Sequence, residues 1–143
     1  MNVATILKLK GRSVATAKPD NTLQEIAAKL AQKRIGAIVV VGENGHVDGI
    51  ISERDVIRAI GEGGAAALQK QARDVMTANV VSCSEASALD ELMDLMTTGR
   101  FRHLPVMEDG NLVGIVSIGD VVKNHVAEVE MEASSMRSYL ATG

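Results

Sequence analysis

Two short segments of this chain carry a glycine, a serine and an aspartate at the same spacing, Gly-x-x-Ser-x-x-Asp. Their residues are Gly49, Ser52 and Asp55, and then Gly114, Ser117 and Asp120. In each segment an apolar run ends at the serine, where a helical pattern begins. The free N–H groups and the dipole of a helix start attract an anion such as phosphate, and the serine hydroxyl adds a donor. The aspartate, one turn into the helix, is an acceptor suited to the two hydroxyls of a ribose.

The same residues also fit a purely structural role. A serine followed three residues later by an acidic residue at a helix start resembles a capping box, in which each side chain accepts a hydrogen bond from the other residue's backbone. Spacing alone does not separate capping from ligand binding. The duplicated glycine and the nearby basic residues favour a ligand, and both interpretations stay open.

Basic residues near the motifs are candidate phosphate contacts. Arg54 lies within the first motif, and Arg102 and His103 begin the string Arg-His-Leu-Pro-Val. An arginine has the forked geometry that suits a phosphate. The alternative is a solvated charged edge, which is how most surface arginines occur. The further cations near these positions are Lys33, Arg34 and Arg100.

The two motifs belong to a longer internal repeat. The stretch 45–56 returns as 110–121 with six of twelve positions identical. The offset between the copies changes from 66 to 65 near Asn44, so the first copy has one extra residue there. A repeat of this size indicates two copies of one small fold facing each other, and a cleft between such copies is a natural ligand site.

Each copy is expected to run strand, helix, strand, strand, helix. In the first copy the predicted segments are 13–17, 22–33, 36–41, 47–52 and 53–60. In the second copy they are 80–82, 88–98, 103–107, 112–117 and a long helix from 119 to about 140. Three glycines at 61, 63 and 64 predict a mobile surface loop over 61–72. The expected organisation is an N-terminal segment 1–12, a first repeat 13–61, a linker 62–77, a second repeat 78–126 and a helical extension 127–143.

Composition limits the fold and the classes of function. The 143 residues, 46% of them hydrophobic, are enough for one compact domain, and only Phe101 and Tyr139 are aromatic, so the core must be aliphatic. The single cysteine, Cys83, excludes an internal disulfide and a multi-cysteine metal site, and we expect it to face the core. A net charge of −3 argues against a general nucleic-acid binder. No membrane span or export signal is recognisable, which favours a cytoplasmic protein.

The last helix carries a second apolar pattern. Its apolar positions step by 4, 3, 4, 3 and 4 residues, which is a heptad seam of the kind that pairs with another helix. The seam residues are Val122, Val126, Val129, Ala133, Met136 and Leu140. Pairing across a homodimer is favoured, and packing of the helix on its own domain is the alternative.

Together these residues resemble a tandem pair of cystathionine-β-synthase (CBS) domains, also called a Bateman module. The resemblance rests on the two motifs about 65 residues apart and on Arg-His-Leu-Pro-Val before the second motif, and it covers roughly 11–126. Three further strings sharpen it, Lys10-Gly11-Arg12, Ser52-Glu53-Arg54-Asp55 and Asp74-Val75-Met76-Thr77. With the long last helix, they resemble small stand-alone bacterial CBS proteins that carry no attached enzyme.

The resemblance implies an α/β (α+β) fold of two pseudo-symmetric β-α-β-β-α repeats packed through their sheets, with an extended C-terminal helix. It also implies an adenosine ligand between the copies: AMP first, then ATP or ADP, NAD(H) or S-adenosylmethionine. The motif aspartates would hold ribose and the serines would lie near phosphate, with Arg102 and His103 reaching it from the opposite copy. Adenine would lie against the short first strands. The remaining site residues implied are Val14, Thr16, Gly36, Ile38, Val80, Ser82 and Pro105.

The two copies differ, so we expect unequal clefts. The first copy has Gly36 and Ala37 where the second has Arg102 and His103. If the clefts cross copies, Arg54 and the first motif would face that Arg-His pair in a strongly basic cleft. The other cleft would meet fewer cations and would bind more weakly or with a different selectivity.

The function expected from these features is that of a homodimeric sensor that binds an adenosine nucleotide and relays this to an unknown regulated protein. No catalytic cofactor, metal, membrane or nucleic acid is expected. A protein-interaction scaffold with empty clefts is one alternative. An enzyme is another, although His46 and His125 form no recognisable ligand set with Cys83. Head-to-head and head-to-tail dimers both stay open.

Overall fold

A computed structural model describes residues 1–142 of the chain. In chain order the first elements are α1 (Val3–Lys10), β1 (Thr16–Ala17), α2 (Leu23–Lys33), β2 (Ala37–Val41), the 3₁₀ turn η1 (Glu43–Gly45), β3 (Val47–Ser52) and α3 (Glu53–Gly63). The 3₁₀ turn η2 (Gly64–Gln69), α4 (Ala72–Val75), α5 (Leu89–Gly99), β4 (His103–Glu108), β5 (Asn111–Ser117) and α6 (Ile118–Thr142) follow. The last residue of the predicted helical extension, 143, lies outside the described residues.

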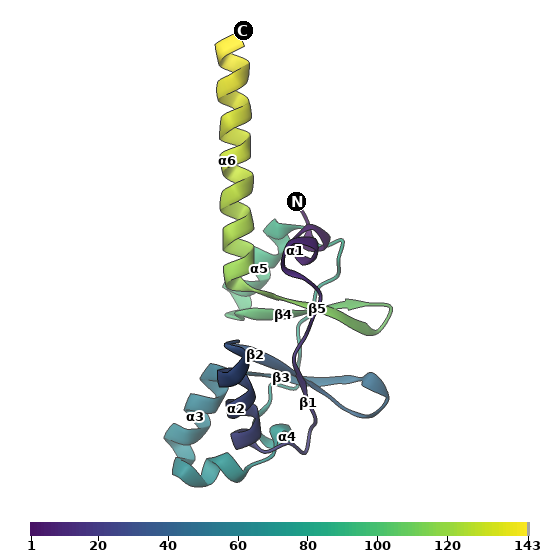
Figure 1. Cartoon of the computed structure of the whole chain (residues 1–143), viewed down its shortest axis with the longest axis vertical. Coiled ribbons are helices and arrows are strands. Elements are labelled where there is room, and N and C mark those ends of the chain that lie inside the picture. The colour runs from purple at the N-terminus through teal and green to yellow at the C-terminus, as the bar shows by residue number, and fades with distance from the viewer. Residues whose placement is uncertain (143) are drawn as a thin grey trace.

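Two small sheets form the centre of the molecule. In the first copy β1 pairs parallel to β2, and β2 pairs antiparallel to β3. In the second copy β4 and β5 form an antiparallel pair. Figure 1 shows the two sheets stacked one above the other, with helices on the outer sides of both. The predicted fold of two similar mixed repeats with a long last helix is therefore confirmed.

Each copy is completed by the helix that precedes the other copy. Helix α1 comes before the first copy but packs on the second, where Val3 N–H donates to the Ser87 carbonyl at 3.0 Å. Helix α4 comes before the second copy but packs on the first, where Ala72 N–H donates to the Asn21 carbonyl at 2.8 Å. Figure 1 shows α1 in the lobe of β4 and β5, and α4 in the lobe of β2 and β3. The sequence analysis did not foresee this exchange.

The core is aliphatic, as predicted, but it is divided into two. One buried cluster belongs to the first copy and includes Ala72 of α4, and the other belongs to the second copy and includes α1. The first cluster is Ala17, Leu23, Ile26, Leu30, Ile38, Val40, Ile51, Val56 and Ala72. The second is Val3, Ile6, Leu7, Cys83, Leu89, Leu92, Met96, Leu104, Val106, Val116 and Val121. Each copy therefore has its own core, and the sheets of the two copies do not merge.

The predicted mobile loop over 61–72 is wrong. Helix α3 continues through Gly61 to Gly63, and the chain then forms η2 and α4. Ala67 and Ala72 in this segment are 1% and 0% exposed. The glycines are compatible with this order because the buried alanines that follow them anchor the segment, and burial of these side chains outweighs the low helix propensity of glycine.

The predicted strand over 80–82 does not form. Within the described residues, the nearest pairing is one parallel bridge between Cys83, directly after this segment, and Val106. Thr77 is held on the first copy by two backbone hydrogen bonds with Ile50, of 3.0 and 3.1 Å. Residues 78–82 must therefore cross from one sheet to the other, and pairing with β4 begins only at Cys83.

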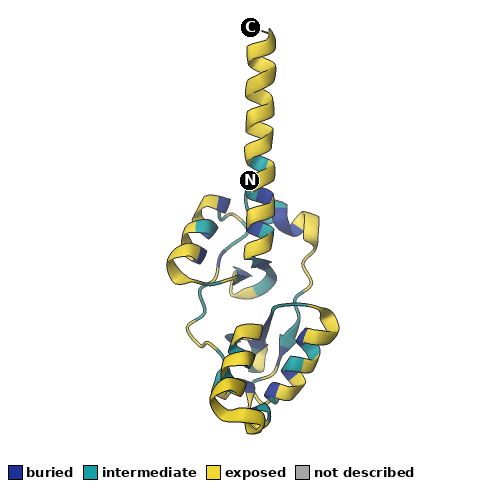
Figure 2. Cartoon of the chain, turned by 90° about the vertical axis from the view of Figure 1, so that its left-hand side faces the viewer, coloured by how far each residue is buried: buried dark blue, intermediate teal, exposed yellow. Residues whose placement is uncertain are grey.

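Helix α6 leaves the body of the protein after its first turns. Val121 and Asn124 are buried against the second copy, whereas the rest of the helix is largely exposed, as Figure 2 shows in yellow. The seam residues Val126, Val129 and Leu140 are 49%, 48% and 69% exposed. The seam therefore does not pack on its own domain. Through Thr142, none of the helices combines the length and the apolar character needed to cross a bilayer.

Candidate functional site

Both motif serines form capping boxes with their aspartates. Ser52 N–H donates to Asp55 Oδ2 at 2.8 Å, and Asp55 N–H donates to Ser52 Oγ at 3.3 Å. The second motif repeats this arrangement at 2.9 and 3.1 Å between Ser117 and Asp120. The structural interpretation of the motif is thus confirmed at the starts of α3 and α6.

Further backbone groups at these helix starts are already paired. Glu53 N–H donates to the Gly36 carbonyl at 2.9 Å, and Ile118 N–H donates to the Arg102 carbonyl at 2.8 Å. Few N–H groups therefore remain for an anion, which weakens the part of the prediction that relied on the helix dipole. Capping uses only Oδ2 of each aspartate, and a carboxylate has about four acceptor positions. Capping and ligand binding are therefore compatible.

The motif glycines allow close packing of the segments that precede each copy. A Cβ atom on Gly49 would lie 2.6 Å from Met76 Sδ and 2.8 Å from the Thr77 carbonyl oxygen. A Cβ atom on Gly114 would lie 2.8 Å from a methyl group of Leu7. The repeated glycine is therefore explained by packing and carries no direct evidence of a ligand.

One cleft crosses between the copies next to the first motif. It encloses about 310 Å³. It brings Ser52, Arg54 and Asp55 of the first copy together with Arg102 and His103 of the second, as the sequence analysis expected. The other lining residues are Gly36, Ile50, Glu53, Arg58, Thr77, Gly99, Arg100 and Phe101. We call this the first cleft.

The first cleft concentrates positive charge beside one aromatic ring. Four of its lining residues are arginines, Arg54, Arg58, Arg100 and Arg102, against two carboxylates. Arg58 Nη1 lies 3.6 Å from Asp55 Oδ1, and the Asp55 side chain is only 14% exposed. Sequence reasoning did not assign Arg58 or Phe101 to the site, although Phe101 stands directly before the Arg-His pair. This lining can meet a phosphate with arginines and a planar apolar group with Phe101.

A second cleft lies next to the second motif and also crosses copies. It encloses about 550 Å³ and includes the predicted residues Val14 and Ser117. The other lining residues are Lys10, Ser13, Ala15, Lys33, Arg34, Ile35, Gly36, Ala37, His103 and Ile115. Three of these are lysines or arginines, against four arginines in the first cleft. The predicted contrast in cation number is therefore small.

The carboxylate of Asp120 is engaged by a lysine. Lys10 Nζ donates to Asp120 Oδ2 at 2.6 Å and to the Ile115 carbonyl at 3.0 Å. Burial alone would raise the pKa of Asp120, but the hydrogen bonds from Lys10 and Ser117 hold that pKa below its usual range. At neutral pH this carboxylate is therefore charged and paired.

His103 lies between the two clefts and lines both. Burial lowers the pKa of His103 below its usual value of 6.5, while the nearby charge of Glu53 opposes that effect. A Cβ atom on Gly36 would lie 3.2 Å from His103 Cε1 and Nε2, so the imidazole rests on that glycine. Gly36, a predicted site residue, thus makes room for His103.

Several predicted ligand-binding residues do not line either cleft, among them Asp120, which is paired with Lys10. Ile38 is fully buried and Pro105 is also buried, so both lie in the cores. Thr16 borders a separate hollow, where its carbonyl accepts a hydrogen bond from Lys29 Nζ at 2.6 Å. Val80 and Ser82 lie in the crossing segment that replaces the predicted strand. Of the two predicted first strands, only the one over 13–17 reaches a cleft, through residues such as Val14 that precede β1.

Metal binding and thiol chemistry have no recognisable site in residues 1–142. No group of three or more His, Cys, Asp or Glu side chains converges on a possible metal position within that range. Cys83 is buried as predicted, and burial raises the pKa of its thiol to about 11. The thiol is therefore protonated at neutral pH and is a poor nucleophile.

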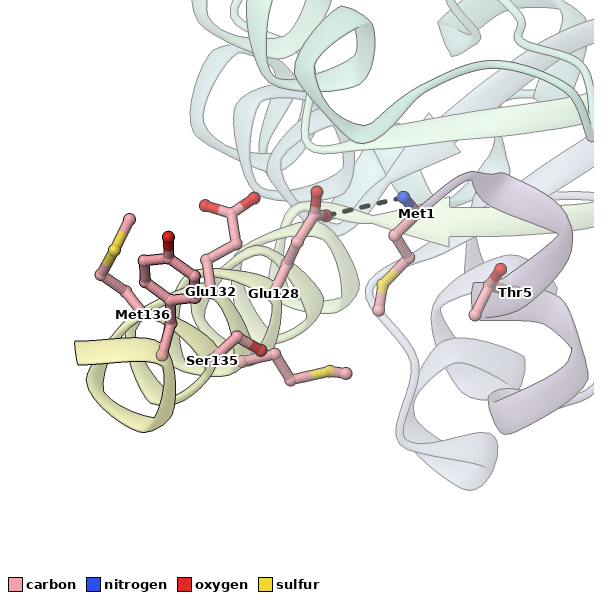
Figure 3. Close-up of a pocket in the computed structure, with 8 residues that line it drawn as sticks. Met1, Thr5, Glu128, Glu132, Ser135 and Met136 are labelled. Carbon is pink, nitrogen blue, oxygen red and sulfur yellow. Dashed lines mark ion pairs between the residues drawn. The ribbon is translucent and has the colours of Figure 1, made fainter. Parts of the chain in front are cut away.

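An apolar groove lies away from both clefts, between the N-terminus and α6. Figure 3 shows Met1 and Thr5 on one side and residues of α6 on the other. The α-amino group of Met1 lies 3.8 Å from Glu128, an ion pair that closes one end. The lining side chains from α6 are Glu128, Met131, Glu132, Ser135, Met136 and Tyr139. This groove shares no residue with the clefts.

The repeat found in the sequence agrees with a known family. The family model described as CBS domain matches residues 9–62 and 72–126. The chain belongs to the CBS-domain family. The structure is similar to that of the CBS-domain containing protein ATU1752 from Agrobacterium tumefaciens, with a TM-score of 0.83 and 50% sequence identity. The match covers 85% of this chain and 91% of that one.

Two further relatives extend the comparison. The mitochondrial CBS domain-containing protein CBSX3 of Arabidopsis thaliana is 33% identical over an alignment of 149 positions. The alignment covers 99% of this chain and 72% of that protein. The CBS domain pair of protein MJ0100 is 25% identical, with a TM-score of 0.78 over 90% of this chain and 98% of that one. The MJ0100 structure is a complex with 5-methylthioadenosine and S-adenosyl-L-methionine.

Proposed function

We propose that this CBS-domain pair is a regulatory module that binds an adenosine nucleotide in the first cleft. The observation that carries the proposal is the convergence of Ser52 and Asp55 from one copy with Arg102 and His103 from the other. Asp55 has acceptor capacity beyond its capping bond for ribose hydroxyls, and the arginines can pair with phosphate. AMP is the first candidate, followed by ATP or ADP and NAD(H).

Two observations bear on the choice of ligand. The four arginines of the first cleft favour a phosphorylated ligand over S-adenosylmethionine, which carries no phosphate. The MJ0100 pair, a relative of low identity, binds S-adenosyl-L-methionine and 5-methylthioadenosine, so adenosine itself is the shared part of the proposal. A cavity of about 310 Å³ is at the lower end of the usual range for ligand pockets, which favours a mononucleotide.

We further propose that the protein is a homodimer whose α6 helices pair through the heptad seam. A heptad seam selects a helix with the same repeat, and the α6 helix of a second copy provides one. The exposure of Val126, Val129 and Leu140 in the single chain supports this pairing. In this proposal nucleotide binding changes the angle between the two copies, and the paired helices relay the change to a regulated protein. Such a relay requires the nucleotide to bind one conformation more tightly than the other.

The test compares two capping aspartates. Asp55→Ala removes a capping box that borders the first cleft, and Asp74→Ala removes a capping box on α4 that borders neither cleft. Both changes are expected to lower the free energy of unfolding by about 1 kcal/mol. Calorimetric titration should then show AMP affinity at least roughly tenfold weaker for Asp55→Ala alone, since a carboxylate hydrogen bond is lost. Equal AMP binding by both variants would reduce Asp55 to a helix cap.

A further inference from the structure

The exchange of α1 and α4 places two different side chains at equivalent positions of the repeat. With the offset of 66 residues, Lys10 at the end of α1 corresponds to Met76, directly after α4. Met76 lies over Gly49 of the first motif strand, and the Asp55 carboxylate meets no lysine. Lys10 instead reaches the carboxylate of the second motif. The two aspartates thus differ in their cation, a lysine at 2.6 Å from Asp120 and an exposed arginine at 3.6 Å from Asp55.

The position of Lys10 is fixed by the helix that carries it. Val3, Ile6 and Leu7 of α1 are 0%, 1% and 1% exposed, so α1 is anchored in the core of the second copy. The ammonium group of Lys10 is held between Asp120 Oδ2 and the Ile115 carbonyl, and its side chain is 32% exposed. This is a two-point contact made by a residue whose backbone is already ordered, so it costs side-chain entropy but no further backbone entropy.

A ribose must compete with this ammonium. Hydroxyl groups that approach the Asp120 carboxylate would replace a hydrogen bond between two opposite charges by bonds in which only the carboxylate is charged. Displacing Lys10 also leaves an ammonium group beside the carbonyl of Ile115 without its carboxylate partner. At Asp55 the competing cation is held more loosely, because Arg58 Nη1 lies 3.6 Å from Asp55 Oδ1 and its side chain is 67% exposed.

We propose that Lys10 is a specificity-determining residue that occupies the ribose position of the second cleft and keeps adenosine ligands out of it. This inference rests on the proposed function, because it takes Asp55 and Asp120 as equivalent ribose acceptors. The protein then binds adenosine nucleotides in the first cleft well before the second. The weaker second cleft follows from one lysine rather than from a smaller number of cations.

The test isolates the second cleft and removes the lysine. In an Asp55→Ala background, Lys10→Met installs the residue found at the matching position of the other copy, Met76. Titration with adenosine should show affinity at least roughly tenfold higher for Asp55→Ala/Lys10→Met than for Asp55→Ala. Lys8→Met removes the same charge from an exposed position of the same helix and should leave adenosine affinity unchanged. Adenosine is the probe because it has the ribose but no phosphate.

The outcomes separate this inference from the proposed function. If Lys10→Met leaves adenosine affinity unchanged, or weakens AMP binding, Lys10 is not a competitor and the inference is overturned while the first cleft stands. If the unmodified protein binds neither adenosine nor AMP, both proposals fail.

A readout without ligand comes from NMR titration of the Asp120 carboxyl, whose pKa should rise in Lys10→Met because its cationic partner is lost. An unchanged pKa would show that the ion pair does not form in solution, which also overturns the inference.

Discussion

The imidazole ring of His103 rests directly on Gly36, and this pair forms a wall shared by both clefts. His103 comes from the second copy and Gly36 from the first, where the repeat has no side chain to oppose the ring. A ligand in either cleft would therefore touch the same histidine. The contact links the two clefts through one side chain.

Gly36→Ala should disturb both clefts through His103. The new Cβ atom would lie 3.2 Å from Cε1 and Nε2 of the ring, so the imidazole must move by a few tenths of an ångström. We expect AMP affinity to fall about threefold to tenfold, with a loss of unfolding free energy below about 1 kcal/mol. Gly61→Ala is the control, because its Cβ atom meets nothing within 4 Å. Equal AMP affinity in both variants would contradict a role for the shared wall.

The exchange of helices predicts where damage to α1 will appear. Ile6→Ala should lower the free energy of unfolding by about 2–5 kcal/mol, because Ile6 is 1% exposed in the core of the second copy. Hydrogen–deuterium exchange should rise first in β4, β5 and α5. Leu9→Ala, at a position 73% exposed on the same helix, should change little. Faster exchange beginning in β2 and β3 would show that α1 does not support the second copy.

The dimer proposal makes a prediction about one face of α6. Val129→Glu places a charge in the seam and should shift the protein from dimer to monomer, since a buried unpaired carboxylate is costly at a helix interface. Ser134→Glu adds the same charge outside the seam and should leave the dimer intact. Sedimentation equilibrium distinguishes the two. A single-chain species in the unmodified protein would contradict the dimer.

Half-buried His103 makes the free energy of unfolding depend on pH, and the lowered pKa of His103 sets the direction. The pKa of His103 is lowered from 6.5, so the unfolded chain takes up this proton first as pH falls. The contribution of neutral His103 to the free energy of unfolding is therefore complete above about pH 6.5. It is lost progressively as pH falls towards the lower pKa of His103 in the folded protein. Urea unfolding at pH 8 and pH 5.5 should show a smaller loss of stability in His103→Gln than in the unmodified protein. An identical loss in both would mean that His103 is not the group responsible.

Much of the fold and the centre of the first cleft could be predicted from the repeat. The motif predicted the starts of α3 and α6, and the presence of Gly36 and Ala37 where the second copy has Arg102 and His103 predicted that the clefts would differ. The capping bonds of Ser52 and Asp55 followed from spacing because they are local. Such features depend on neighbours three or four residues away.

What sequence reasoning missed depends on contacts between distant segments. Nothing local indicates that Leu7 packs under Gly114, or that Lys10 reaches Asp120 across 110 positions. The missing strand before Cys83 has the same origin, because Thr77 is held by Ile50 of the other copy. The helical conformation of 64–69 depends on the burial of Ala67, which glycine content alone does not reveal.

The central claim is that an adenosine nucleotide binds this protein, and a thermal-shift screen tests it most directly. The ligands are AMP, ADP, ATP, NAD⁺, NADH and S-adenosylmethionine. A ligand present at 100 times its Kd stabilises the fold by about 2.7 kcal/mol, which raises Tm by several degrees at this chain length. We predict such a rise with AMP, reduced to about half in Asp55→Ala by a tenfold loss of affinity and retained in Asp74→Ala. No rise with any of the six ligands would contradict the account and leave Ser52, Asp55, Ser117 and Asp120 as helix caps.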